Sequence, residues 1–378
     1  MSELTKPLQG KPPRRIAGIS IVGVLLTLLG LLLVGAVAVT ILSWDPETPT
    51  ASTPIETLPS AGDVVIRAPE EGGNAGATIT TPDGMPANGA GVVIREAGAT
   101  APIALSTVVN QALLESGHYG PIPRIGPDGL RPLDAYLRPL PPGGVTGRPR
   151  IAIIIGGVGL GRTGTQQAIE MLPPEVSLAL APYGANLRTV AADAREAGHE
   201  IFLQVPLEPF DFPANDPGEH TLIVDDPAAT NIDRLEWLMT QFGMYAGIVT
   251  YAGGRFTGEA AALQPLVDEL ARRGLMLVDD GASARSVTAD VSVGVVPYAR
   301  ADFVIDTVDD LTAVANRLAQ LEALAQQRGF AIGSGSAFPN TIEAVRAWAA
   351  TALSRGFEVV PVTALRVDPL QGTLIQVP

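Results

Sequence analysis

Short apolar runs and longer amphipathic segments alternate along the chain from residue 150 onward. Most of the runs are continuous, which is typical of strands in a parallel sheet covered on both faces. They lie at 151–155, 176–181, 201–205, 246–250, 275–278, 293–297, 303–305 and 356–362. Segments with helical periodicity separate them and include 185–197, 228–242, 259–273, 309–328 and 341–355. This alternation predicts an α/β fold, either a doubly wound sheet or a (β/α) barrel.

The longest apolar stretch lies near the N-terminus. Residues 16–44 contain no charged side chain, and a basic segment, 1–15, precedes them. A spanning helix needs about 20 apolar residues, and a positive flank predicts that the N-terminus stays in the cytoplasm. Ala36-Val-Ala38 would suit cleavage of a signal peptide, but the apolar core exceeds the roughly 7–15 residues of a typical signal. We therefore expect one uncleaved inner-membrane helix over 16–43, with the C-terminal domain in the periplasm.

The composition changes after this segment. Residues 44–117 are rich in Pro, Thr, Ala and Gly, which predicts a disordered linker. A lead-in segment, 118–148, follows, and 149–378 is long enough to form a buried core. The chain has no cysteine, so this domain must be stable without disulfides. The formal charge of −14 argues against a nucleic-acid partner.

The first strand of the domain ends in two glycines, Gly156 and Gly157. The stretch around them, and further blocks downstream in the same order, resemble the bacterial divergent polysaccharide deacetylases over about residues 148–366. The matching blocks are 148–159, 198–209, 247–253, 277–280 and 335–342, with shorter pieces upstream at 119–129 and 132–136. The resemblance implies an irregular (β/α) barrel of about seven strands, with its site at the C-terminal strand ends.

The resemblance also implies a catalytic metal, but its ligand positions carry other residues here. The paired aspartates of the family fall on Gly156 and Gly157, and its first histidine on Gln204. The Asn-His pair falls on Thr250 and Tyr251, and the last histidine on Ser336. Around this site, the family residue types remain at Pro206, Glu208, Asp279 and Gly335.

A catalytic divalent metal needs about three protein ligands. The chain has three histidines, His118, His199 and His220, and none of them stands in register with a lost ligand. Glu208, Asp279 and Asp280 could bind a hard cation weakly through oxygen, but carboxylates at strand ends are more often solvated or capping groups. We therefore expect neither a metal nor another cofactor.

The glycine-rich loop also permits a nucleotide-binding hypothesis. Residues 156–163 differ by one substitution from a phosphate-binding P-loop, because Arg162 stands where that motif has lysine. Gly159-x-Gly-x-x-Gly164 matches the dinucleotide fingerprint, but the segment where its acidic partner should follow, 178–182, is apolar. We favour this hypothesis least.

Aromatic residues near the strand ends could stack on sugar rings or simply close the mouth of a barrel. They are Tyr183, Phe210, Phe212, Tyr251, Phe256 and Phe338. The sequence therefore predicts a catalytically degenerate envelope protein that binds peptidoglycan or another envelope glycan, or that acts as a scaffold for envelope proteins. The alternative is an active carbohydrate deacetylase or hydrolase that uses Glu208 and Asp279. The vestigial site comprises Gly156, Gly157, Gln204, Glu208, Tyr251, Asp279, Asp280 and Ser336.

Overall fold

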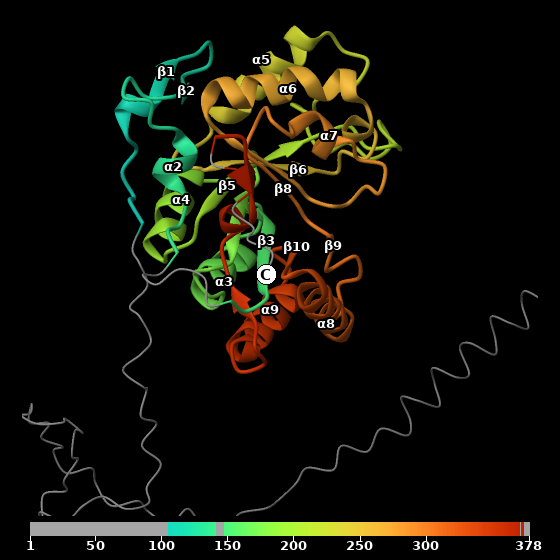
Figure 1. Cartoon of the computed structure of the whole chain (residues 1–378). Helices are drawn as coiled ribbons and strands as arrows, with labels where there is room; N and C mark the ends of the chain where they lie inside the picture. Colours follow the sequence, from blue (N-terminus) through green and yellow to red (C-terminus); the bar gives the residue numbers. More distant parts are fainter. Residues whose placement is uncertain (1–104, 141–146, 371, 374–378) are drawn as a thin grey trace, which may run out of the picture. The chain divides into compact units, whose positions relative to one another are not determined.

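The apolar run that begins at Ile151 forms the central strand of a large sheet, β3 (Arg150–Val158). In the computed structural model, which describes residues 105–140, 147–370 and 372–373 (Figure 1), β3 pairs in parallel with β4 (Ser177–Leu180) and β10 (Phe330–Ser336). The short strand β11 (Glu358–Val359) pairs with its first residues. All but one of the nine residues of β3 are buried, because both faces of the strand are covered.

The sheet continues away from β3 on both sides. Its order is β13-β12-β8-β7-β6-β5-β4-β3-β10-β9. The pairs from β4 to β8 and those of β10 are parallel, whereas β12 pairs antiparallel with β8 and β13. The remaining strands are β5 (Ile201–Pro206), β6 (Gly247–Tyr251), β7 (Met276–Asp279), β8 (Tyr298–Arg300), β9 (Phe303–Val304), β12 (Val367–Asp368) and β13 (Gly372–Thr373).

The sheet is strongly curled. Only two residues of chain separate strands β8 and β9, yet six other strands lie between them in the strand order. The hydrogen-bonded path nevertheless has two free ends, β9 and β13. The described part of the chain thus forms a curled mixed sheet, a half-barrel, where the family resemblance implied a barrel of about seven strands.

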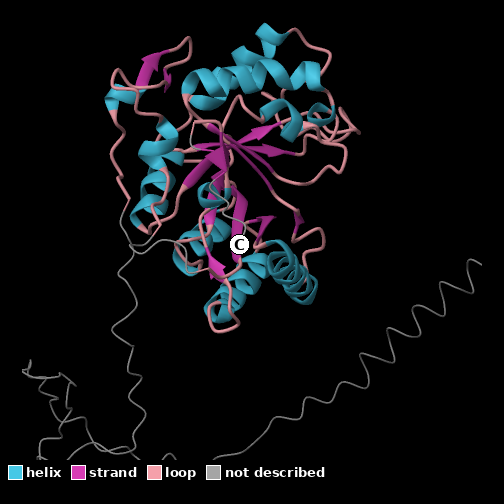
Figure 2. Ribbon diagram, in the orientation of Figure 1, coloured by secondary structure: helices cyan, strands magenta, loops and turns pink. Residues whose placement is uncertain are grey.

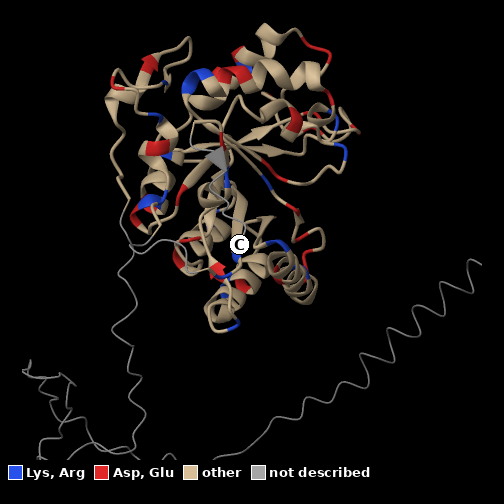
Figure 3. Ribbon diagram, viewed as in Figure 1, with Lys and Arg blue, Asp and Glu red and all other residues tan. Residues whose placement is uncertain are grey.

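Helices cover the outside of the sheet (Figure 2). They are α3 (Arg162–Met171), α4 (Leu187–Glu196), α5 (Ala228–Met239), α6 (Ala260–Arg273), α7 (Thr288–Ser292), α8 (Leu311–Arg328) and α9 (Pro339–Ala352). Short 3-10 turns add η2 (Phe256–Gly258) and η3 (Val362–Leu365). Most charged positions lie on helices and loops, whereas the strands at the centre are largely uncharged (Figure 3).

The segment before β3 packs against this domain. It contains η1 (Gln111–Leu113), a hairpin of β1 (Leu114–Ser116) and β2 (Pro121–Pro123), and α2 (Pro132–Tyr136). Residues 105–117, which the sequence placed in the linker, thus include η1 and β1. Arg131 fixes α2 to the sheet by an ion pair of 2.7 Å with the buried Asp368.

The run 293–297 is not a strand: Gly294 has a positive φ of 78°, and Val293 is 63% exposed, so the chain turns there and reaches β8 only at Tyr298. The proposed membrane helix over 16–43 lies outside the described residues. Within 105–140, 147–370 and 372–373, no helix is both long enough and apolar enough to cross a bilayer.

Candidate functional site

The C-terminal ends of four strands meet at one cavity of about 450 Å³. Gly157 reaches it from β3, Gln204 from β5, Tyr251 from β6 and Ser336 from β10. The sequence had predicted that these four residues belong to one site, and the structure brings them together. Gly156 lies beside them under Gln204, whereas Glu208, Asp279 and Asp280 do not line the cavity.

The Gln204 side chain occupies the space beside Gly156 that a side chain at this position would fill. Its Oε1 accepts a hydrogen bond of 2.9 Å from the backbone N–H of Gly157. A Cβ atom on Gly156 would lie only 2.8 Å from the Gln204 Nε2. Gly157 has a positive φ of 72°, a conformation that disfavours any side chain. The floor of the cavity is therefore an amide held against a bare backbone, where the resemblance implied charged metal ligands.

The rim of the cavity is apolar and aromatic. Tyr183, Tyr251 and Phe338 line it and are 38%, 45% and 45% exposed, and Leu160 is exposed beside them. No charged side chain is among the lining residues. Such a surface favours a neutral ligand with flat apolar faces.

Sequence reasoning found only some of these residues. Phe256 is fully buried in the core, and Phe210 and Phe212 do not line the cavity. Several residues that loops bring to the rim were not predicted from the sequence, because their positions depend on the curl of the sheet. These are Gly164, Ala181, Pro182, Pro217 and Pro339.

Glu208 is held in structural contacts. The side chain is 3% exposed, and its carboxylate accepts a hydrogen bond of 2.7 Å from the backbone N–H of Val224. The other oxygen pairs with the Arg255 guanidinium, which also contacts Asp225 at 2.6 Å. Both oxygens of Glu208 thus fasten the loop after β5 to neighbouring loops.

Asp279 is likewise saturated with partners. It is 1% exposed at the end of β7 and accepts hydrogen bonds from the Gly281 N–H at 2.9 Å and the Ser286 hydroxyl at 2.6 Å. Arg300 Nε lies 3.5 Å from the same carboxylate. These contacts organise the turn after β7.

Asp280 has an unusual protonation equilibrium. Burial raises the pKa of its carboxyl to about 7, and the charge of the adjacent Asp279 acts in the same direction. The Ala282 N–H donates to this carboxyl at 3.0 Å, and the Asp280 N–H donates to the Thr250 hydroxyl at 2.9 Å. A carboxyl that titrates near neutrality can exchange protons at physiological pH, although it does not line the cavity.

Ser336 is positioned by a buried carboxylate. Its backbone N–H donates to Asp306 at 2.6 Å, and Thr341 donates to the same oxygen at 3.0 Å. Burial raises the pKa of Asp306 above its ordinary value. Asp306 therefore fixes the end of β10, which carries Ser336 and Phe338 to the cavity.

Side chains of the types that bind metals lie apart from one another in the described part of the chain. Within the described residues, no group of three or more His, Cys, Asp or Glu side chains could hold a metal ion. His199 is fully buried, with its ring nitrogens 2.8 and 3.2 Å from the carbonyls of Val176 and Ile169. His220 stacks on Trp237 at 3.7 Å between ring centroids, and His118 packs edge-on against Tyr119.

The glycine-rich loop is committed to internal contacts. The Gly157 N–H binds Gln204, and the Gly159 N–H binds the Thr165 hydroxyl at 2.8 Å. A Cβ on Gly164 would lie 2.3 Å from the Ala337 carbonyl oxygen, so this glycine permits α3 to approach the loop after β10. These contacts explain the glycines as packing positions and do not favour a phosphate cradle.

Comparison with known proteins agrees with this architecture. Residues 153–366 match the family described as divergent polysaccharide deacetylase, which is more than half of the chain. The chain belongs to this family. It is 24% identical over 202 residues to the uncharacterized protein YibQ of Escherichia coli strain K12, an alignment that covers 52% of this chain and 61% of YibQ.

A solved structure provides a further relative. The crystal structure of the uncharacterized protein ATU2773 from Agrobacterium tumefaciens C58 shares 44% sequence identity with this chain, at a TM-score of 0.62. The match covers 65% of this chain and 98% of that one. Neither relative's description names a ligand or a reaction, so the function is inferred from the site itself.

Proposed function

We propose that this protein binds a neutral envelope glycan at the C-terminal strand ends without hydrolysing it through a metal. The observation that carries the proposal is the uncharged cavity of about 450 Å³ lined by Gly157, Gln204, Tyr251 and Ser336. Small-molecule sites usually have about 300–1,000 Å³ and a few polar groups in an apolar lining. We expect this ligand to be an uncharged glycan or an uncharged fragment of peptidoglycan.

The chemistry of the lining supports a sugar ligand. Tyr183, Tyr251 and Phe338 are partly exposed aromatic residues, and aromatic rings can pack against the apolar face of a pyranose. The Gln204 amide and the Ser336 hydroxyl supply the polar groups that orient hydroxyl or acetamido substituents. Because Gln204 is fixed by the Gly157 N–H, it is preorganised for recognition.

The carboxylates support a binding role over hydrolysis. Glu208 and Asp279 are used in ion pairs and hydrogen bonds that hold loops together, and both lie outside the cavity lining. An active deacetylase or hydrolase using these two residues is the alternative, and a protein scaffold is the other non-enzymatic role. We further propose that residues 16–43 anchor the chain in the inner membrane and that its folded domain lies in the periplasm.

The test is binding of soluble peptidoglycan fragments to the full chain by calorimetry. Tyr251→Ala should weaken binding about tenfold, as expected for the loss of roughly 1–1.5 kcal/mol of aromatic contact. Phe210→Ala is the matched control, because this aromatic residue is 60% exposed but does not line the cavity. The Phe210→Ala variant should bind the fragments with the same affinity as the wild type.

Other outcomes would favour the alternatives. Absence of saturable binding in the wild type, or an unchanged affinity for Tyr251→Ala, would reject the glycan site and favour a scaffold role. Release of acetate from an acetylated fragment, abolished in Glu208→Gln, would instead establish the hydrolase.

A further inference from the structure

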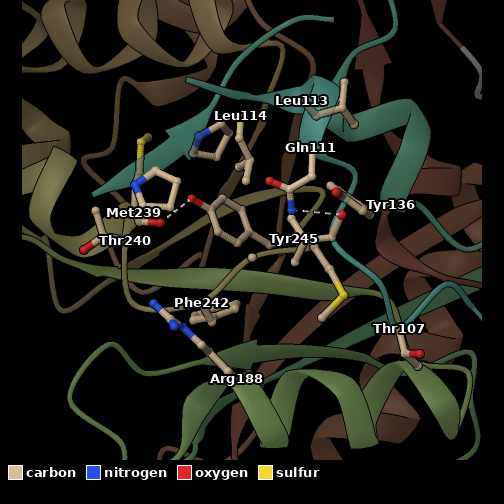
Figure 4. A pocket seen from close by; sticks show the side chains of 15 residues that line it. Thr107, Gln111, Leu113, Leu114, Tyr136, Arg188, Met239, Thr240, Phe242 and Tyr245 are labelled. Atoms are coloured by element: carbon tan, nitrogen blue, oxygen red, sulfur yellow. Dashed lines mark hydrogen bonds between the residues drawn. The ribbon is translucent and has the colours of Figure 1, made fainter. Parts of the chain in front are cut away.

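A second cavity, of about 370 Å³, lies where the segment before β3 packs on the domain (Figure 4). Its walls come from η1, β1, β2 and α2 on one side and from α4 and residues 239–245 on the other. It shares no lining residue with the cavity at the strand ends. Any ligand here would therefore bind independently of the glycan site.

The inside of this cavity is apolar. Leu113 and Tyr245 are each 1% exposed, and Phe242 and Met244 lie beside them. The Tyr245 hydroxyl donates to the Met239 carbonyl at 3.0 Å, so this polar group is already satisfied. The aromatic ring and the aliphatic side chains consequently present apolar surface, which suits the hydrocarbon part of a ligand.

Arg188 is the only charged residue among those that line the cavity. Figure 4 shows it reaching from α4 toward Phe242. Within the described residues, its guanidinium has no ion pair or hydrogen bond. An unpaired guanidinium at the edge of an apolar cavity can bind a carboxylate through two parallel hydrogen bonds.

A second arginine on the same helix, Arg195, lies outside the lining of the cavity and holds the neighbouring segment in place. Arg195 follows Arg188 by two helical turns and is 1% exposed. Its guanidinium donates to the carbonyls of Ser106 at 2.6 Å and Tyr136 at 2.9 Å, with no carboxylate paired to it among the described residues. Burial lowers its pKa to about 10, so it remains charged at neutral pH.

We propose that this cavity binds a medium-chain fatty acid, with its carboxylate on Arg188 and its acyl chain against Phe242 and Tyr245. In a chain whose formal charge is −14, an apolar cavity whose single charged lining residue is an arginine favours an anion over a cation. One unpaired guanidinium matches the single charge of a carboxylate better than the nearly double charge of a phosphate monoester.

Octanoate is the probe, titrated calorimetrically into the full chain in a neutral detergent. Partition of octanoate into detergent is the same for every variant, so differences between variants report on the site. Arg188→Gln should lower the affinity at least about tenfold, because a hydrogen-bonded charge is lost. Arg317→Gln removes the same charge from α8, where the guanidinium contacts Gln320 and Phe303, and should leave the affinity unchanged.

Two further measurements distinguish a specific site from unspecific adsorption. Gly243→Leu should abolish binding, since a Cβ there would already lie 3.2 Å from Val109 and a larger side chain would fill the cavity. Octan-1-ol should bind the wild type no better than octanoate binds Arg188→Gln. The proposal is overturned if the wild type shows no saturable binding, or if Arg188→Gln binds octanoate like the wild type. Tyr251→Ala should leave octanoate binding intact, which separates this site from the glycan site.

Discussion

Gln204 and the glycines at 156 and 157 form one unit. The Gln204 side chain takes the space that a side chain on Gly156 would need, and it satisfies the Gly157 N–H. An aspartate at 156 would collide with Gln204, and one at 157 would have to adopt a positive φ. An aspartate at 156 would therefore have to displace the Gln204 amide from its hydrogen bond with the Gly157 N–H.

Asp280 leads to a pH-dependent prediction. Burial raises its folded-state pKa to about 7, above the ordinary value of 3.8, so the folded protein favours the protonated carboxyl. Stability is therefore lost as the pH rises from the unfolded pKa through the folded pKa. Asp280→Asn should raise the free energy of unfolding by about 1–3 kcal/mol near pH 8 and change it little near pH 4. Urea denaturation at both pH values measures this difference.

The adjacent aspartate provides the control. Asp279 accepts hydrogen bonds from Gly281 and Ser286 and pairs with Arg300, so Asp279→Asn should destabilise the protein at neutral and higher pH. Equal destabilisation by Asp280→Asn at both pH values would contradict the argument from burial.

Residue types predicted which aromatic side chains lie near the strand ends, but not which of them face the cavity. Tyr183, Tyr251 and Phe338 were expected near a site and do line the cavity. Phe256 and Phe338 carry the same side chain, but Phe256 begins the 3-10 turn η2 and its side chain is buried in the core. Whether a strand-end aromatic faces inward or outward depends on loop geometry, which no local pattern in the sequence reveals.

The continuous apolar runs predicted most of the parallel strands. Runs at 151–155, 176–181, 201–205, 246–250 and 275–278 correspond to β3 through β7. Strand β10 was missed, because the alternation of Gly and Ser at 333–336 does not read as an apolar run. A Cβ on Gly333 would lie 2.6 Å from Leu321, so the glycine exists to let α8 approach the strand. Such a glycine weakens the sequence signal where packing is tightest.

At the same scale, α4 joins the segment before β3 to the domain. The buried Arg195 supplies hydrogen bonds to the carbonyls of Ser106 and Tyr136, and its guanidinium lies over the Tyr136 ring at 5.3 Å. Arg195→Ala should lower the free energy of unfolding by about 2–4 kcal/mol, because two carbonyls lose their donor and a cavity opens. The shift of the urea midpoint measures this change.

Arg188 on the same helix is the matched control. It is exposed and forms no ion pair or hydrogen bond within the described residues, so Arg188→Ala should change stability by no more than about 0.5 kcal/mol. If both substitutions shifted the urea midpoint equally, Arg195 would not be the residue that holds the segment in place.

For the whole molecule, the sequence predicted the α/β class and grouped Gly157, Gln204, Tyr251 and Ser336, which line one cavity at the strand ends. It could not predict how far the sheet closes. The curl is set by the sum of twists between neighbouring strands and by short strands such as β8 and β9, whose lengths of three and two residues carry almost no periodic signal. The half-barrel is therefore a property of the assembled sheet rather than of any one segment.

The metal content of the whole protein is the last prediction. Gly156, Gly157, Gln204, Tyr251 and Ser336 stand at the positions that the family resemblance assigns to metal ligands, and a divalent ion needs about three such ligands. The full chain should therefore retain no stoichiometric Zn²⁺, Mn²⁺ or Ni²⁺ after dialysis, as measured by elemental analysis. Adding each ion should also leave the thermal unfolding midpoint unchanged, because an ion that does not bind the folded state cannot stabilise it.

A tightly retained ion would reverse this interpretation. The candidate ligands near the strand ends are Glu208, Asp279 and Asp280, which would need to leave their present partners, Arg255, Ser286 and Ala282. Asn or Gln substitution of each carboxylate would then lower the metal content together with any hydrolytic activity. Retention of the ion in all three variants would instead locate the metal outside this site, and the glycan-binding proposal would stand.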